Sequence, residues 1–166
     1  MNPTSSSKDF RATHFVHKEL SRIFGEPSLA SLLTLRNEVK SNAMCVDSTL
    51  GGGSHGHLGL VFTPAVYATI PGTVAYTRPV LPTLTVTQTD TQYIIAEARN
   101  QYAIDLQSFR EINAVERAII QQIVTAVEGK YLKAIKNKLT NINKTIPQIL
   151  QHLFDTYGDI SLKELS

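Results

Sequence analysis

Residues 88–127 read QTDTQYIIAEARNQYAIDLQSFREINAVERAIIQQIVTAV, and neither a glycine nor a proline interrupts them. Thr89 or Asp90 can cap the free N–H groups at the start of this stretch. The dipeptide at 128–129, Glu-Gly, is expected to end it. The stretch predicts a long helical run, as one helix or as two helices separated near 111–113. The apolar residues that recur along it at helical spacing are Tyr93, Ala96, Ala103, Leu106, Ile112, Val115, Ile119, Ile123 and Val127.

Two helices are predicted before this run. Ser28 can cap a helix over about 28–42, in which leucines and a valine recur every three or four positions. Thr63 is a good cap for a short second helix, and Pro64 is tolerated at its first position, where an N–H would have no partner. This short helix should end by the Pro-Gly pair at 71–72.

A further turn or two of helix is expected over 131–139, and one more helix after it. Thr145 and Gln148 form a capping box at the start of the later helix. Gly158 stands where a left-handed C-terminal cap would end it. A second capping box at 161–164 has no helix after it, so we expect this chain to be a domain truncated at its C-terminus from a longer polyprotein.

The segment between the first helix and the long run is almost uncharged. Residues 41–89 carry two charges, Asp47 and Arg78, together with six of the nine glycines and four of the seven prolines. This composition favours ordered irregular structure that packs against the helices. Within it, Pro79 and Pro82 exclude a central strand, so 73–86 are expected to be extended or an edge strand.

The sequence thus predicts a mainly α, multi-helix domain with an irregular Gly/Pro-rich segment between the first helix and the long run. The domain should span 28–166 and follow a loosely ordered segment, 1–27. The chain has 166 residues, a mass of 18.3 kDa and 42% hydrophobic residues, which favours one domain. No apolar run approaches the roughly 18 residues of a membrane span, so no membrane partner is expected.

The glycine-histidine stretch at 51–59, GGGSHGHLG, is the most unusual part of the sequence. A phosphate-binding P-loop requires a Gly-Lys pair that opens a helix, and this stretch has no lysine. A metal could be held by the histidines with Cys45 or Asp47, but a His-x-His pair alone is a weak signal. We therefore predict a tight structural loop and expect no metal or cofactor. Its key residues are Gly51, Gly52, Gly53, His55 and His57.

No motif in the sequence supports catalysis. There is no Gly-x-Ser-x-Gly elbow. Cys45 could pair with His55 or His57, but a single cysteine between Met44 and Val46 is more typical of a core residue. We therefore expect no enzymatic activity. A small metal-dependent hydrolase that uses His55 and His57 stays open as an alternative.

A run of lysines is the clearest candidate for a binding surface. The stretch from 129 to 144 carries a charge of +5 without an acid, which can neutralise phosphates and give salt-dependent RNA affinity. Tyr131 is a candidate for stacking on a base. A solvated face beside a turn is the alternative interpretation. The lysines are Lys130, Lys133, Lys136, Lys138 and Lys144.

Taken in order, several segments resemble the capsid-forming region of the Gag polyprotein of copia-type LTR retrotransposons. The resemblance covers about 28–166. It is carried by Ser41-Asn42-Ala43, GGGSHGHLGLVFTPAVYATI at 51–70, Arg78-Pro79, QQIVTAVEGKYLKAIKN at 121–137 and TIPQILQHLFDTYGDIS at 145–161.

This resemblance implies a helical, non-catalytic domain that self-associates into cytoplasmic virus-like particles enclosing the element's RNA. A zinc knuckle often follows the capsid region in that family, and this chain has none. Its hold on RNA would then come from basic residues, or from a part of the protein outside this chain, and non-specific binding is expected. The alternative is a monomeric helical module that binds nucleic acid or protein.

Overall fold

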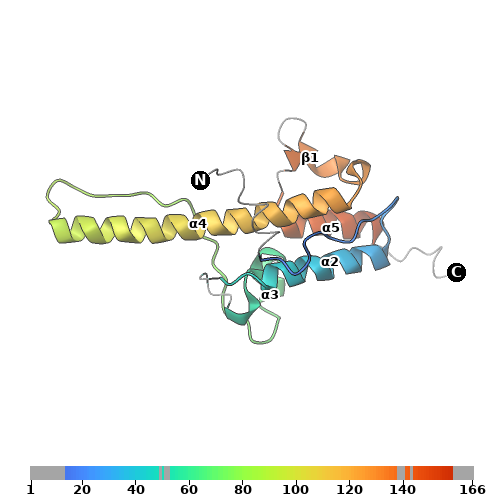
Figure 1. Ribbon diagram of the computed structural model, residues 1–166, viewed down its shortest axis with the longest axis horizontal. Coiled ribbons are helices and arrows are strands. Elements are labelled where there is room, and N and C mark those ends of the chain that lie inside the picture. The colour runs from blue at the N-terminus through green and yellow to red at the C-terminus, as the bar shows by residue number, and fades with distance from the viewer. Residues whose placement is uncertain (1–13, 49, 51–52, 138–140, 143, 159–166) are drawn as a thin grey trace.

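Figure 1 shows the computed structural model, which describes residues 14–48, 50, 53–137, 141–142 and 144–158. The expectation of a mainly α chain is confirmed. The helices are α2 (Leu29–Met44), α3 (Pro64–Tyr67), α4 (Gln92–Ala126) and α5 (Ile146–Tyr157). Single 3₁₀ turns lie at η2 (Gly53–His55), η3 (Leu58–Leu60), η4 (Gly129–Tyr131) and η5 (Lys133–Ile135), and β1 (Lys136–Asn137) pairs antiparallel with β2 (Asn141–Ile142).

Three predicted helix starts agree with the structure because their signals are local. Ser28 and Thr145 each accept a hydrogen bond from the backbone N–H three residues on, and both complete a capping box. Thr63 caps α3 through the N–H of Val66. Each side chain satisfies an N–H group that the helix itself leaves without a partner.

The long helix α4 is one unbroken helix, and its cap is Thr91. We expected Thr89 or Asp90 in that role. The Asp90 carboxylate is occupied one turn earlier, where it accepts the backbone N–H of Thr87 at 2.7 Å. That hydrogen bond closes a turn, so the helix starts one residue later. The helix ends at Ala126 with Val127 as its C-cap, just before the Glu-Gly pair at 128–129 that was expected to end it.

The body of the molecule is formed by α2, α5 and the second half of α4 (Figure 1). Apolar faces of all three helices meet in one core, which burial of aliphatic side chains stabilises. Fully buried members of this core are Leu32, Leu35, Val39, Ile112, Val115, Ile119, Ile123, Ile149 and Leu153.

The first half of α4 leaves this body and projects from it (Figure 1). None of residues 92–111 is buried, and burial along the helix begins at Ile112. The apolar face predicted along the whole stretch is therefore a core face only in its second half. Nearer the start, Leu106 is half-buried and Tyr93, Ala96 and Ala103 are exposed.

An extended segment accompanies the projecting half of α4. Residues 73–87 contain neither helix nor strand, and they run beside the helix out to its start (Figure 1). The two prolines of this segment each lack an N–H, which agrees with the expectation that it does not form a central strand. We call residues 79–108, which comprise the outer part of the extended segment and the first part of α4, the arm.

Residues 14–27 differ from the loosely ordered segment expected over 1–27. Phe15, Leu20 and Ile23 are buried in the core, and the N–H of Ile23 donates to the Ala126 carbonyl at 2.8 Å. The segment therefore packs across the body as an ordered strap. Residues 1–13 lie outside the described part of the chain.

Two buried amide side chains hold this strap. Asn42 of α2 accepts the backbone N–H of His17 at 2.8 Å and donates to the His17 carbonyl at 3.0 Å. It also donates to Gln122 of α4 at 2.8 Å, and Gln122 donates to the carbonyls of His17 and Lys18. Buried amides cost free energy unless they are paired, and here both amides are paired with the strap.

The chain after α4 is less helical than expected. In place of further α-helix over 131–139, two 3₁₀ turns lead into the short β1–β2 pair. Gly158 ends α5, but its φ of −89° is not the left-handed value that we expected. Glycine fits there because a Cβ would lie 2.7 Å from the Phe154 carbonyl oxygen. The capping box at 161–164 lies outside the described residues.

None of the described helices combines the length and the apolarity that crossing a membrane requires.

Replacing Asn42 with alanine tests the amide cluster. The change leaves the Gln122 amide oxygen and the His17 N–H without their buried partner, and we expect the free energy of unfolding to fall by about 2–4 kcal/mol. Asn37→Ala, at an exposed position of the same helix, should stay within about 0.5 kcal/mol of the parent. Urea unfolding measures both, and equal losses would contradict a bridging role for Asn42.

Candidate functional site

The described part of the glycine-histidine stretch, 53–59, packs against the end of α2, and Gly56 is a position in it that demands glycine. Gly56 has a φ of +54°, and a Cβ there would collide with the carbonyl oxygens of Ala43, Met44 and Val46. Both the conformation and the lack of space demand glycine. Gly53 begins η2, whereas Gly51 and Gly52 lie outside the described residues.

This loop delivers His57 into the body, where the side chain is fully buried. Its Nδ1 lies 2.6 Å from the Tyr76 hydroxyl, and its Nε2 lies 3.0 Å from a carboxylate oxygen of Glu111. A carboxylate only accepts, so we assign the proton to Nε2 and let the Tyr76 hydroxyl donate to Nδ1. One imidazole thus joins the loop, the extended segment and α4.

Burial decides the protonation of this cluster. It lowers the pKa of His57, and the hydrogen bond and charge of Glu111 oppose that shift without reversing it. Burial also raises the pKa of Tyr76. The cluster is therefore a neutral imidazole, a neutral phenol and a carboxylate. Both ring nitrogens of His57 have protein partners, which leaves neither one for a metal or a substrate.

Among the described residues, the others considered for metal binding or catalysis do not complete a ligand set with His57, and Asp47 reaches it only through a backbone hydrogen bond. The Cys45 thiol donates to the backbone carbonyls of His14, at 2.9 Å, and Asn42, at 3.1 Å. The Nδ1 atom of His55 is buried without a hydrogen-bond partner among the described residues. Within that same part of the chain, no three His, Cys, Asp or Glu side chains are placed to hold a metal ion.

A second polar contact lies at the base of the arm. The Arg78 guanidinium, from the extended segment, makes a two-pronged ion pair with Glu116 of α4 at 2.6 and 2.8 Å and donates to the Asn113 amide oxygen at 2.9 Å. Glu116 raises the pKa of Arg78, so the guanidinium stays charged. With the His57–Glu111 hydrogen bond, this pair fastens the extended segment to α4 where that helix leaves the body.

The predicted lysine run lies between α4 and α5. Lys130, Lys133 and Lys144 are exposed, and Lys136 belongs to β1. Lys138 lies outside the described residues. The Lys130 ammonium is 4.0 Å from a Glu128 carboxylate, a distance at which an exposed pair contributes little.

Tyr131 is not the free stacking platform that we considered for RNA. Its ring makes an edge-to-face contact with Tyr157 of α5, with centroids 5.4 Å apart. The Lys130 ammonium covers it at 5.1 Å from the ring centroid. Tyr131 therefore packs η4 onto α5, and charge rather than base stacking is what this surface offers to a polyanion.

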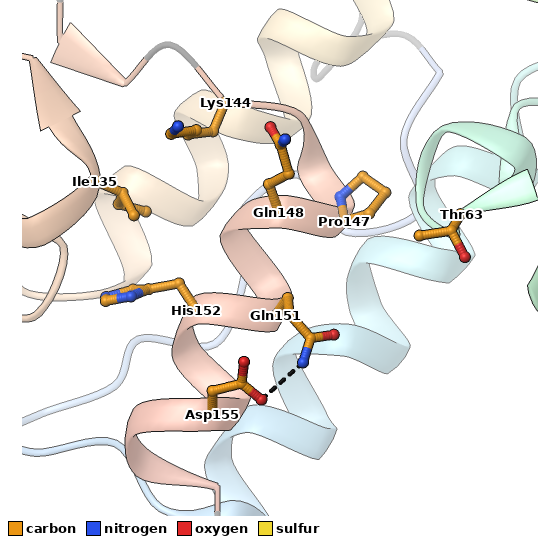
Figure 2. Close-up of a pocket in the computed structure, with 8 residues that line it drawn as sticks. All are labelled: Thr63, Ile135, Lys144, Pro147, Gln148, Gln151, His152 and Asp155. Carbon is orange, nitrogen blue, oxygen red and sulfur yellow. Dashed lines mark hydrogen bonds between the residues drawn. The ribbon is translucent and has the colours of Figure 1, made fainter.

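A groove of about 410 Å³ opens beside the lysine run, and Figure 2 labels the eight residues that line it. Ile135 and Pro147 supply an apolar lining, and Lys144 lies at one side. Gln148 and His152 project into it from α5 (Figure 2). We call this surface the α5 groove. It combines apolar contacts with two charged side chains, Lys144 and Asp155. The sequence did not reveal this combination because α5 and the lysine run meet only in the fold.

The arm carries the other exposed surface of note. Seven of the thirteen large hydrophobic side chains exposed in the described chain lie on it, with Val80 82% and Tyr93 74% exposed. Exposed apolar clusters of this kind usually mark an interaction site. The seven residues are Val80, Leu81, Leu84, Val86, Tyr93, Ile94 and Ile104.

Sequence reasoning missed the partners of His57. Tyr76 and Glu111 carry no local signal, because they are 19 and 54 residues away from it along the chain. The apolar arm was partly signalled by the low charge of 41–89. No family model, no curated protein and no solved structure matches this chain.

Two tyrosines that contact each other allow a paired test of the His57 cluster. Tyr76→Phe removes the donor to a buried imidazole nitrogen, and we expect a loss of about 1–3 kcal/mol in the free energy of unfolding. Tyr67→Phe removes a buried hydroxyl that has no partner among the described residues, so stability should stay level or rise by about 1 kcal/mol. Chemical denaturation of both variants decides, and a loss of equal size in both would contradict the assignment.

The lowered pKa of His57 predicts a dependence of stability on pH. The unfolded chain, with a histidine pKa of 6.5, binds the proton more readily than the folded chain does. The contribution of His57 is therefore fully present above pH 6.5 and is lost as the pH falls from 6.5 toward the folded pKa. We expect His57→Gln to show a smaller fall in unfolding free energy than the parent between about pH 7.5 and about pH 5.5.

If the glutamine variant does not fold, NMR titration of the His57 ring in the parent replaces this comparison. A ring that titrates at or above 6.5, the ordinary histidine value, would contradict the prediction.

Proposed function

We propose that this chain is a structural subunit of the Gag capsid type, similar to that of copia-type LTR retrotransposons, which self-associates into virus-like particles. The sequence resemblance over 28–166 suggests it. The mainly α architecture is compatible with it. The resemblance places such particles in the cytoplasm around element RNA. No catalytic role is proposed, and neither is a metal-dependent hydrolase based on His55 and His57.

The apolar arm is the observation that carries this proposal. Residues 79–96 hold six exposed large hydrophobic side chains and one charged residue, Asp90. In a single copy these side chains are in contact with water. Each side chain that a neighbouring copy buries would strengthen the free energy of association by roughly 1–3 kcal/mol. A subunit that touches several neighbours gains from many such contacts at once.

The exposed lysines support non-specific RNA as the second partner. They lie on the body, apart from the arm, so the chain carries one surface suited to polyanions and another suited to apolar contacts. Phosphate contacts of this kind have little sequence preference and weaken with salt. A monomeric module that binds nucleic acid or protein would use the same lysines, so oligomeric mass is the property that separates the two functions.

Light scattering after size exclusion, over a range of protein concentrations and with or without RNA, tests the proposal. We expect assemblies whose mass grows with concentration and grows further when RNA is added. Chain that stays monomeric at every concentration would contradict a capsid role and favour the monomeric module.

The RNA contribution is tested with Lys130→Gln/Lys136→Gln. The salt dependence of its affinity for single-stranded RNA should become shallower, by about 0.7 in the logarithmic slope for each phosphate that the variant no longer neutralises. Arg22→Gln/Arg117→Gln, which removes the same charge at exposed positions outside the lysine run, should leave the slope closer to the parent value.

A further inference from the structure

The arm and the α5 groove are complementary in charge and in apolar character. The arm carries Asp90, Glu97 and Asp105 against Arg99, a net charge of −2. At the groove, the described charged residues are Lys133 and Lys144 against Asp155, a net charge of +1. We propose that the arm of one copy docks in the α5 groove of a second copy, so that copies join head to tail. This inference names the contact behind the proposed self-association and rests on it.

The arm cannot reach the groove of its own chain. α4 is a continuous helix from Gln92 to Ala126, and the arm points away from the body that contains α5 (Figure 1). The Arg78–Glu116 ion pair and the His57–Glu111 hydrogen bond hold the extended segment to the base of the arm. Any groove that this arm fills therefore belongs to another molecule.

The groove is a better partner for the arm than a second arm is. Two arms side by side would bring together surfaces of the same net charge, which weakens association. In the lining of the α5 groove, Lys144 offers the opposite charge, Asp155 offsets it, and Ile135 and Pro147 supply apolar contacts for side chains such as Tyr93. Lys133, in the turn that leads to Ile135, is exposed and makes the net charge at the groove positive.

The size and symmetry of the contact suit an assembling subunit. The helical part of the arm, 92–108, is about 25 Å long at 1.5 Å per residue. Together, this helix and the extended segment present an outer surface close to the several hundred Å² that each partner buries in a specific complex. Because the arm and the groove are different surfaces, the contact is heterologous. Such contacts repeat from copy to copy, and they close into rings or continue as open arrays.

Two charge-reversal variants of the full chain test the contact in protein freed of RNA. The arm variant is Glu97→Arg/Asp105→Arg, and the groove variant is Lys133→Glu/Lys144→Glu. Each variant by itself presents like charges across the contact, and we expect its self-association to weaken at least about tenfold. An equimolar mixture restores opposite charges, since the reversed arm meets the reversed groove and the unchanged arm meets the unchanged groove. Light scattering of the mixture should return to the parent value.

Matched controls separate this contact from attraction between molecules of different net charge. Glu19→Arg/Glu26→Arg and Arg22→Glu/Arg117→Glu change the net charge by the same amounts at exposed positions outside both surfaces. Neither pair should weaken self-association as strongly as the arm and groove variants do. Equal weakening by the controls, or equal rescue on mixing them, would overturn the proposal.

A variant without charge changes covers the case in which a reversed chain does not fold. Tyr93→Ser/Ile94→Ser removes exposed side chains of the arm, so the thermal midpoint should hold while self-association falls about tenfold or more. Unchanged association would overturn the proposal.

The outcomes also distinguish this contact from the proposed function. If the parent assembles and all arm and groove variants assemble equally well, the contact is wrong and self-association stands. If the groove variant assembles like the parent without RNA but no longer binds a poly(U) probe, the lysines serve RNA and the contact is overturned. A parent chain that is monomeric throughout contradicts both proposals.

Discussion

One buried imidazole joins the two parts of the arm at its base. His57 lies between Tyr76, at the start of the extended segment, and Glu111, the residue before α4 becomes buried. The Arg78–Glu116 pair ties the same two elements together about one turn further into the body. Burial along the arm does not fix it, because none of its helical residues is buried. The helical part of the arm takes its direction from the continuous helix α4, and the polar contacts at its base hold the extended segment against that helix.

Buried hydrogen bonds also position the irregular parts of the body. Apolar burial is not directional, so it cannot by itself select how a glycine-rich loop or an N-terminal strap lies across three helices. Hydrogen bonds can select one arrangement, because leaving a buried polar group without a partner lowers the free energy of unfolding. Asn42 and Gln122 position the strap through hydrogen bonds to its backbone, and His57 fixes its own loop through hydrogen bonds to Tyr76 and Glu111. This pairing is incomplete at the buried Tyr67 hydroxyl, at His55 Nδ1 and at Arg36 Nε, which find no partner in the described part of the chain.

Features that depend on residues close together in the sequence were predicted, and features that depend on residues far apart were missed. The caps Ser28, Thr63 and Thr145 act on N–H groups within three residues, so local reasoning found them. The helical period through 88–127 was also visible, but period alone cannot tell a face that packs on the body from a face that projects. The contacts that decide this, Tyr76 and Glu111 with His57, join residues far apart in sequence. The strap was missed for the same reason, since its partners Asn42 and Gln122 are themselves 80 residues apart.

A fixed arm changes the thermodynamics of any contact that it makes. Ordering a flexible segment at the moment of binding opposes association, and a segment held in place beforehand avoids that cost. In the proposed assembly each contact is modest and heterologous, so its strength comes from repetition and from the fixed angle between arm and groove. The contacts at the base of the arm then contribute to assembly although no neighbouring copy touches them. Because burial favours the neutral form of His57, protonating this imidazole as the pH falls removes the acceptor for the Tyr76 hydroxyl at the base of the arm.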